Sequence, residues 1–380
     1  MSTLMERVQR RLIDLPGAAT DPAELARLIR EEAGVISDVD VLALLRRLRH
    51  DSTGIGPLEQ ILSLDGVTDI VVNAPDRVFF DRGHGLERAD LTFTDDAEVR
   101  QLATRLAVSC GRRLDDAQPF ADGRLNRDDG SIIRVHALLS PPAERGTCLS
   151  LRVLRQAATT LTELADRETV SPEIADLLRG IIHQRRAFLV VGGTGTGKTT
   201  MLAALLAEVD HRERIVCIED TAELHPPHPH VVTLVSRARN IEGSGEITMS
   251  TLLRQALRMR PDRIVVGEIR GPEVVDLLTA LNTGHDGGAG TVHANSLEEV
   301  PARMEALAAL GGLDRHALAT QLSAAVDVVI VMRRDPTGRR HIHQIGELSG
   351  HPVTARAVWD ADHGPLAGFD EFAAAHRRPA

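Results

Sequence analysis

One basic residue differs in type from all the others. Of the 44 basic residues in the chain, 43 are arginine, and the single lysine is Lys198. Lys198 belongs to the stretch GGTGTGKT, which matches the pattern GxxxxGK[ST] at every fixed position. Such a loop presents backbone N–H groups to phosphates, and a compact ammonium suits β- and γ-phosphates better than a planar guanidinium does. We therefore expect a nucleotide-phosphate site formed by Gly192, Gly193, Thr194, Gly195, Thr196, Gly197, Lys198, Thr199 and Thr200.

The residues on either side of this loop fit a phosphate-binding role. Residues 187–191 are apolar and predict a buried strand, and residues 200–206 predict a helix that starts directly after the loop. The N-terminus of such a helix attracts phosphate. A glycine-rich turn without function is the alternative, but strand, loop and helix agree with the functional interpretation. Within it, the hydroxyl of Thr199 is expected to bind Mg²⁺.

Two further apolar stretches end in acidic residues. Residues 263–266 predict a strand that leads to Glu268, and residues 215–218 predict another that leads to Glu219 and Asp220. In parallel sheets, ligands bind at the carboxyl ends of the strands. We therefore expect Glu268 to hold the Mg²⁺ shell and to polarise the attacking water. Glu219, for catalysis, and Asp220, for the metal, are candidates at the same edge, although two solvated turn acids would give the same pattern.

Two histidines lie in a glycine-rich segment at residues 283–295. His285 and His293 bracket what the sequence predicts to be a flexible loop. Metal binding is one interpretation, but no third ligand is evident. In a chain with a phosphate-binding loop, the pair fits a sensor of the γ-phosphate that moves on hydrolysis, and both are candidate catalytic residues.

Three arginines in the first half of the chain are further candidates. Arg124 follows Asp122-Gly123, and Arg134 and Arg152 lie in predicted strands. An arginine on a strand is usually exposed and inert. In a domain that precedes a nucleotide site, however, such residues can act as arginine fingers, in the same subunit or in a neighbour.

Composition narrows the class of protein. The formal net charge is −10, tyrosine is absent and Trp359 is the only tryptophan, which argues against direct binding of nucleic acid. Cys110, Cys148 and Cys217 are odd in number and widely spaced, which does not support a disulfide framework or a thiolate zinc site. The first residues lack the apolar core of a signal peptide, and no apolar stretch approaches about 18 residues. We expect a soluble cytoplasmic protein that reaches a membrane only through a partner.

The elements that must position these residues divide the chain into five parts. Residues 54–154 mix short strands with helix and predict a small α+β domain. Residues 172–349 alternate strands and helices and predict a parallel α/β domain with helices on both faces of its sheet. The remaining parts are a helical segment at 1–53, a linker at 155–171 and a tail at 350–380.

Together these motifs resemble the secretion ATPase superfamily, which powers type II secretion, type IV pili and type IV secretion. Beside the P-loop, the resemblance rests on an Asp box at residues 218–224, a Walker B segment at 258–270 and a His box at 282–295. Residues 67–73 and 122–125 are similar to the N-terminal part of the family. The Tad/Flp pilus ATPase branch is the closest resemblance.

The resemblance covers about residues 54–335 and implies an architecture. Each subunit of a homo-hexameric ring would have a PAS-like N-terminal domain and a RecA-like C-terminal domain, with ATP and Mg²⁺ between them. Arginines matching Arg124, Arg134 and Arg152 reach the nucleotide phosphates as the domains close. Cycles of closure would push on an inner-membrane platform protein at the inner face of the cell membrane.

Two features depart from the family. The N-terminal extension is short for the Tad/Flp branch, which leaves docking to a membrane partner open. The four-cysteine zinc element of many type II secretion ATPases is absent, which argues against that branch.

Two other functions fit part of the pattern. A DNA-translocating ATPase of conjugation would share the nucleotide site, but the acidic charge and the scarcity of aromatic residues argue against direct contact with DNA. A scaffold that binds ATP without hydrolysing it is a further alternative, and the presence of Lys198, Thr199, Glu268 and the two histidines, His285 and His293, argues against it. We therefore expect an ATP-hydrolysing motor for Tad-type pilus assembly or a related secretion system.

Overall fold

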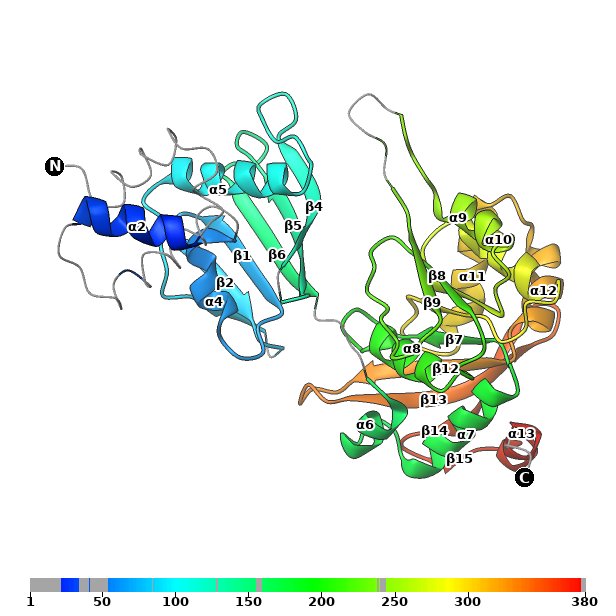
Figure 1. Cartoon of the computed structure of the whole chain (residues 1–380). Helices are drawn as coiled ribbons and strands as arrows, with labels where there is room; N and C mark the ends of the chain where they lie inside the picture. Colours follow the sequence, from blue (N-terminus) through cyan, green and yellow to red (C-terminus); the bar gives the residue numbers. More distant parts are fainter. Residues whose placement is uncertain are drawn as a thin grey trace. The chain divides into compact units, whose positions relative to one another are not determined.

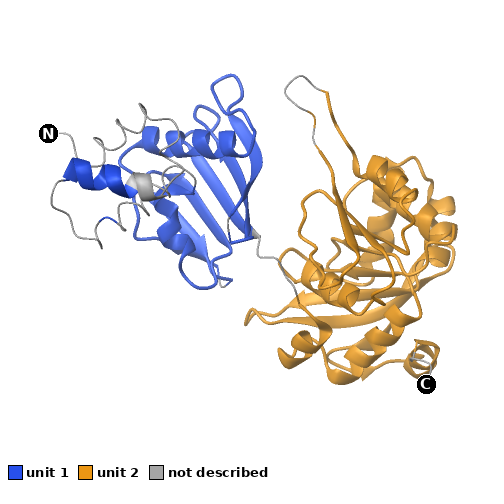
Figure 2. Ribbon diagram, viewed as in Figure 1, with its two compact units in different colours: residues 1–155 blue, residues 156–380 orange. Residues whose placement is uncertain are grey.

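The computed structural model describes residues 22–33, 41, 54–83, 85–127, 129–154, 159–237, 239 and 244–376. The chain forms two compact units, residues 1–155 and residues 156–380 (Figure 2). None of the described helices has the length and apolar character needed to span a bilayer.

One helix precedes the first sheet. Helix α2 (Pro22–Ala33) begins at a proline, which is favoured at the first helical position, and Arg27 pairs with Glu31 one turn later at 3.2 Å. Apart from α2 and Val41, the helical segment predicted at residues 1–53 lies outside the described residues.

The first unit contains a six-stranded antiparallel sheet with strand order β3-β2-β1-β6-β5-β4 (Figure 1). Its strands are β1 (Asp69–Ala74), β2 (Arg77–Asp81), β3 (Leu86–Arg88), β4 (Phe120–Asn126), β5 (Ile132–Leu138) and β6 (Cys148–Leu154). Its helical elements after α2 are η1 (Gly56–Leu58), α4 (Glu59–Leu62) and α5 (Asp96–Ser109). The mixture of short strands and helix is the α+β pattern expected for this part of the chain.

Alternation along the strands decides which face of this sheet is buried. In β5, Ile133 and Val135 are buried and join Leu106 of α5 in one hydrophobic core. Asp95 caps the N-terminus of α5, which fixes where that helix begins. The residue between the two buried ones, Arg134, points to the other face of the sheet.

The second unit is built on a nine-stranded sheet with strand order β15-β14-β13-β12-β7-β11-β10-β8-β9. Its strands are β7 (Phe188–Val191), β8 (Ile215–Glu219), β9 (Val231–Val235), β10 (Arg263–Ile269), β11 (Ala289–Val292), β12 (Val328–Arg334), β13 (Arg340–Ser349), β14 (Thr354–Asp360) and β15 (Gly364–Pro365). Its helices are α6 (Leu161–Asp166), α7 (Pro172–His183), α8 (Lys198–Ala207), α9 (Met249–Ala256), α10 (Glu273–Leu281), α11 (Glu299–Leu310), α12 (Arg315–Ala325) and α13 (Phe369–His376). Strands β12, β7, β11, β10, β8 and β9 run parallel, and β13 to β15 extend the sheet in antiparallel fashion.

Alternate residues of the central strands face two separate cores. In β7, Phe188 and Val190 pack with residues of α7 and α8, whereas Leu189 and Val191 pack with residues of α9 to α12. All four are buried, which explains why the strand reads as a continuous apolar run. Helices therefore cover both faces of the parallel sheet, the arrangement that the sequence predicted (Figure 1).

The C-terminal residues differ from the tail expected at 350–380. Residues 354–360 form β14, which pairs with β13, and Val358 is fully buried. Phe369 and Phe372 of α13 join the same core. The Pro, His and Gly residues around this strand predict turns. The alternating run between them is too short to predict a strand by itself.

The segment expected as a linker, residues 155–171, also contains structure. Thr160 and Glu163 form a capping box at the start of α6. Leu161 and Leu164 of this helix are buried in the core of the second unit. Ordered structure in this unit therefore begins before residue 172, where the sequence placed the start of the domain.

Candidate functional site

The glycine-rich loop between β7 and α8 depends on two of its glycines. Gly197 has a φ of +93° directly before Lys198, the first residue of α8. Gly192 has a φ of +156°, and a Cβ there would lie 2.5 Å from the carbonyl oxygen of Met332. Both positions therefore require glycine, because any other residue would be strained or would clash.

Lys198 folds back over this loop. Its ammonium donates hydrogen bonds to the carbonyl oxygens of Gly192 at 2.9 Å and Gly193 at 3.0 Å. An ammonium has three N–H donors, so one remains for a phosphate oxygen. Burial lowers the pKa of Lys198, while the negative charge of Glu268 opposes this effect and the charge of Arg270 adds to it. Glu268 therefore lies within electrostatic reach of the lysine.

Glu268 and Thr199 each offer a side-chain oxygen that could hold Mg²⁺ at the phosphate loop. Glu268 lies near the end of β10, with 31% of its side chain exposed, and its Oε2 accepts a hydrogen bond from Arg270. Thr199 follows Lys198 in the first turn of α8. Hydroxyl and carboxylate oxygens are the ligands that Mg²⁺ prefers when phosphates and waters complete its shell, so these two side chains fit the ion.

Glu219 is the last residue of β8 and is almost completely buried, with 3% of its surface exposed. Its Oε1 accepts hydrogen bonds from the backbone N–H groups of Glu223 and Leu224, each at 3.0 Å. Gly267 in β10 leaves room for it, because a Cβ there would lie 2.7 Å from Cγ of Glu219. These contacts hold the turn after β8 together and favour a structural role over the catalytic one expected from the sequence.

Glu223, on the same turn, is a more accessible acid than Glu219, although the sequence analysis did not select it. Its side chain is only partly buried. The pKa of Arg270 is raised chiefly by its hydrogen bond to Glu268, against the effect of burial, and to a smaller degree by the charges of Asp220 and Glu223. Glu223 thus lies within electrostatic reach of Arg270, and its partial exposure lets it exchange a proton with water. The sequence contained a signal for Glu223, because it is the third acidic residue in the segment that begins with Glu219 and Asp220.

His293 follows β11 and lies beside the phosphate loop. Its Nε2 is 3.1 Å from the hydroxyl oxygen of Thr194. Asn295 lies on the same side, because a Cβ on Gly193 would lie 3.4 Å from its Oδ1. An imidazole in this position can respond to a change in the loop or in a phosphate bound to it.

His285 is not brought to this site within the second unit. Strands β11 and β7 run parallel, with Ala289 opposite Phe188, so the residues before β11 lie at the sheet edge away from the phosphate loop. The segment between the two histidines contains a buried strand, where the sequence predicted a flexible loop. His285 and His293 of one subunit therefore cannot share a metal ion or act together on one phosphate.

The three arginines of the first unit form one row across its sheet. Arg124 lies opposite Arg134, and Arg134 lies opposite Arg152 on the next strand. Residues that face each other on neighbouring strands share a face of the sheet. Arg152 donates to Asp69 at 2.8 Å, and Arg134 reaches Asp122 at 3.4 Å. The sequence placed the arginines near or on strands but could not give the register that aligns them.

A second group of arginines, which the sequence analysis missed, lies beside the phosphate loop. Strands β12 and β13 form a hairpin in which Arg334 lies opposite Arg340. Nε of Arg340 donates to the carbonyl oxygen of Gly195 at 3.0 Å. Burial, together with the charge of Arg334, lowers the pKa of Arg340. The sequence contained a signal for this group, because a pair of consecutive arginines stands on each side of the turn at residues 335–338.

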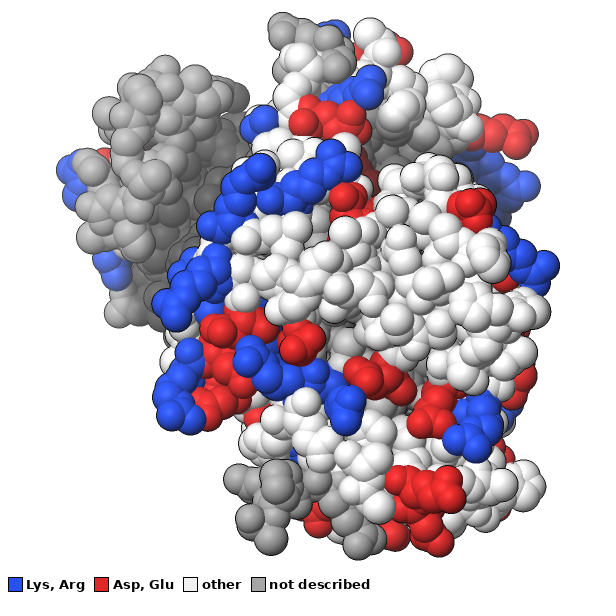
Figure 3. All heavy atoms as spheres, turned by 90° about the vertical axis from the view of Figure 1, so that its right-hand side faces the viewer, with Lys and Arg blue, Asp and Glu red and all other residues white. Residues whose placement is uncertain are grey.

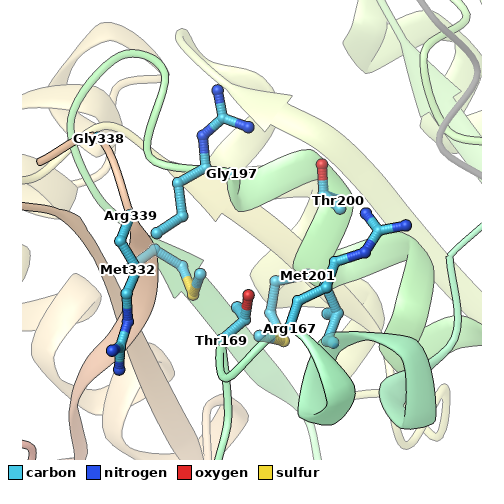
Figure 4. Close-up of a pocket in the computed structure, with 10 residues that line it drawn as sticks. Arg167, Thr169, Gly197, Thr200, Met201, Met332, Gly338 and Arg339 are labelled. Carbon is cyan, nitrogen blue, oxygen red and sulfur yellow. The ribbon is translucent and has the colours of Figure 1, made fainter. Parts of the chain in front are cut away.

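A pocket of about 240 Å³ opens beside the N-terminus of α8 (Figure 4). Figure 4 shows Met332 and Arg339 on one side of it and Thr200 and Met201 on the other. The methionines give it adaptable apolar walls, and arginines lie at its rim. Because Gly197 also lines the pocket, a nucleotide with its phosphates on the loop could place its base or sugar here.

Comparisons with known proteins agree with this geometry. The family model for "Type II/IV secretion system protein" matches residues 51–361. A protein of Mycobacterium tuberculosis H37Rv, provisionally named a conjugal transfer protein, is 57% identical over 346 residues, covering 90% of this chain and 97% of that protein. The conjugal transfer protein TrbB of Rhizobium radiobacter is 31% identical over 319 residues, covering 81% of this chain and 91% of TrbB.

A solved structure shows the same fold. The crystal structure of the pilus retraction motor PilT with bound ADP aligns with a TM-score of 0.56 and 20% sequence identity, covering 84% of this chain and 85% of that chain. The family model matches most of the chain. Together with the phosphate loop and the strand-end acids, this match shows that the chain belongs to the type II/IV secretion system protein family.

Proposed function

We propose that this chain is an ATP-hydrolysing motor of a pilus assembly or secretion system, with ATP and Mg²⁺ as its cofactors. The observation that carries the proposal is the position of Lys198, whose ammonium lies on the phosphate loop at 2.9 and 3.0 Å from the carbonyl oxygens of Gly192 and Gly193, with Glu268 near the end of β10. A cation for the phosphates and a carboxylate for the metal and the water are the central parts of a P-loop hydrolysis site.

The residues of the loop bind and neutralise the phosphates. Backbone N–H groups of residues 192–197 and the N-terminus of α8 cradle the phosphate oxygens. Lys198 offsets the charge that develops on them in the transition state. Thr199 and Glu268 hold Mg²⁺, whose charge further offsets that of the phosphates.

The strand ends supply the groups that act on water. Glu268 polarises the attacking water, and Glu223 accepts the proton that this water loses. His293 follows the state of the phosphate loop through its contact with Thr194. Glu219 takes no part in this scheme, because it is buried in the turn.

The oligomer and the arginine row are further parts of the proposal. We propose a homo-hexamer in which the first unit is PAS-like and Arg124, Arg134 and Arg152 approach the nucleotide phosphates of the same subunit or of a neighbour. The side chains of Arg134 and Arg152 are 43% and 57% exposed, so they are accessible to a phosphate. Closure of the two units around ATP then pushes on a platform protein of the inner membrane, at its cytoplasmic face.

Tad/Flp-type pilus assembly or a related secretion process is the work that we assign to the motor. The motifs resemble that branch, and the family is the type II/IV secretion family.

Conjugal DNA transfer is a second candidate function, because the names of two relatives refer to it. The net charge of −10 argues against a motor that grips DNA directly. On the face shown in Figure 3, acidic side chains are interspersed among the basic ones.

Steady-state hydrolysis of ATP by the purified full-length protein tests the proposal. The assay is run alone, with DNA and with anionic lipid vesicles, with Lys198→Ala as the matched control. Turnover that disappears in Lys198→Ala and does not respond to DNA supports the pilus or secretion motor. Strong stimulation by DNA favours the conjugal candidate, and ATP binding without turnover under any condition indicates a scaffold.

A further inference from the structure

The guanidinium of Arg270 lies between two acids at the phosphate edge. Its Nη2 contacts Oε2 of Glu268, and its Nη1 lies 3.9 Å from Oδ2 of Asp220. The two acids come from different segments, one near the end of β10 and the other just after β8. The Arg270 side chain is 55% exposed, so it has room to change its partner.

Asp220 is also tied to a hairpin. The hydroxyl of Ser236 donates to Oδ1 of Asp220 at 2.8 Å. Directly after Ser236, Arg237 and Ile247 exchange backbone hydrogen bonds of 2.9 and 2.8 Å. We use the term hairpin for the described residues on either side of this bridge, 236, 237, 239 and 244–247. The described segments next to this bridge extend away from the sheet in Figure 1. Asp220 therefore connects the phosphate edge to the base of the hairpin.

We propose that Arg270 is a positioning residue whose guanidinium moves from Glu268 towards Asp220 when Mg²⁺ and nucleotide bind. This inference rests on the proposed function, because it requires Glu268 to help hold the ion. A carboxylate that accepts a hydrogen bond from a guanidinium is a poorer ligand for a second cation, and the two positive charges repel each other. Glu268 must therefore release Arg270, and Asp220 is an acid that already lies 3.9 Å from its Nη1.

The move changes the surroundings of the hairpin. As Arg270 approaches, Oδ2 of Asp220 accepts the guanidinium while Oδ1 still accepts the hydroxyl of Ser236, so the three side chains form one connected hydrogen-bond network. The base of the hairpin then responds to the state of the nucleotide site. In this scheme Asp220 acts on the metal through Arg270 and is not a ligand itself, which replaces the metal-ligand role expected from the sequence.

The hairpin presents charged side chains that would follow this movement. Nε of Arg237 donates to the carbonyl oxygen of Gly245 at 2.7 Å, and Nε of Arg239 pairs with Glu246 at 2.8 Å. Both arginines are exposed. A change at Glu268 would thus reach a surface that carries positive charge.

Binding of Mn²⁺ in the presence of saturating ADP, followed by electron paramagnetic resonance, tests the proposal without relying on turnover. The full-length protein is compared with Arg270→Gln, Asp220→Asn and the double variant. Arg270→Gln should tighten Mn²⁺ binding by about fivefold, the scale of a partly exposed ion pair. Asp220→Asn should weaken it by a similar factor in the native background and should have no effect in the Arg270→Gln background.

Arg254→Gln is the matched control, because Arg254 pairs with Asp276 outside the nucleotide site and should leave Mn²⁺ binding unchanged. Weakening by Asp220→Asn in both backgrounds would make Asp220 a direct ligand and would overturn the inference. Unchanged or weaker Mn²⁺ binding in Arg270→Gln would overturn it as well. Failure of the native protein to bind Mn²⁺ and ADP would overturn the proposed function, and the inference with it, before any variant is compared.

A second measurement needs no variant. Amide hydrogen exchange at Arg237 and Ile247, which close the hairpin, should change when Mn²⁺ and ADP are added to the native protein. ADP without metal should change the exchange rates less, because Glu268 can then keep its hydrogen bond with Arg270. Equal exchange with and without metal would contradict the coupling.

Discussion

The hydroxyl of Thr194 lies 3.1 Å from Nε2 of His293, and this contact joins the phosphate loop to the end of β11. The contact forms because β7 and β11 are parallel neighbours, so their carboxyl ends meet at one edge of the sheet. His285 precedes the same strand and lies at the opposite edge. Two histidines of one sequence motif therefore have different surroundings.

Substitution should separate these two histidines. His293→Ala should lower kcat by about 10²-fold, the usual scale for a lost proton-transfer or sensing group, with nucleotide affinity within about twofold of the native value. His285→Ala should leave nucleotide affinity unchanged and retain most of the turnover. Steady-state hydrolysis and binding of a fluorescent nucleotide measure both effects, and an equal loss of kcat in the two variants would contradict the assignment.

The phosphate loop could be predicted because its chemistry is local. The glycines, Lys198 and the flanking apolar runs lie within about twenty consecutive residues, and each acts through its own backbone or side chain. The segment between the histidines was not predictable in the same way. Residues 289–292 are short and contain small side chains, and only pairing with β7 and β10 makes them a buried strand.

Other parts of the site depend on register and burial, which a single sequence does not contain. Arg340 reaches Gly195 across 145 residues of chain. Arg134 and Arg152 align only because of the pairing of β5 with β6. The sequence predicted that Glu219 lies at the end of a strand, but it could not show that its side chain is buried.

Glu219 and the neighbouring Glu223 should respond oppositely to substitution. Glu219→Ala removes the acceptor of two backbone N–H groups and should lower the free energy of unfolding by about 2 kcal/mol. Glu223→Ala should leave that free energy within about 0.5 kcal/mol of the native value, because the site is only partly buried, and should lower kcat. Urea unfolding and ATP hydrolysis of both variants decide the matter; an unstable Glu223→Ala with normal kcat would reverse the two roles.

Asp360, at the end of β14, should make stability depend on pH. Burial raises its pKa, but hydrogen bonds from His363, the N–H of Asp362 and Gln344 outweigh this effect and lower the pKa to about 2. An unfolded Asp carboxyl has a pKa of about 3.9. Because the folded value is the lower one, the stabilisation is complete above about pH 4 and is lost as the pH falls towards about 2.

Asp360→Asn should therefore lower the free energy of unfolding by about 1 kcal/mol at neutral pH, and the difference from the native protein should disappear near pH 2. Urea midpoints at several pH values measure this. Asp286→Asn, at an exposed position, is the control and should show no such difference. If the variant is as stable as the native protein at neutral pH, then the hydrogen bonds to Asp360 do not stabilise the fold.

The arginine row of the first unit should be needed for turnover and not for folding. Arg134→Ala and Arg152→Ala should lower kcat by about 10³-fold if they stabilise transition-state charge. Arg82→Ala is the control, because Arg82 lies in the same unit, is exposed and pairs with Glu87 of β3 outside the arginine row. It should retain native kcat, and all three variants should unfold at the native urea concentration.

Mixing experiments then show which subunit the row serves. Arg152→Ala and Lys198→Ala are each expected to be inactive alone. If the arginine acts on the nucleotide of a neighbouring subunit, mixed rings contain interfaces in which a native Lys198 meets a native Arg152, and turnover returns on mixing. If it acts within its own subunit, every subunit carries a defect and mixing restores nothing. Full activity of Arg152→Ala by itself would remove the row from the mechanism altogether.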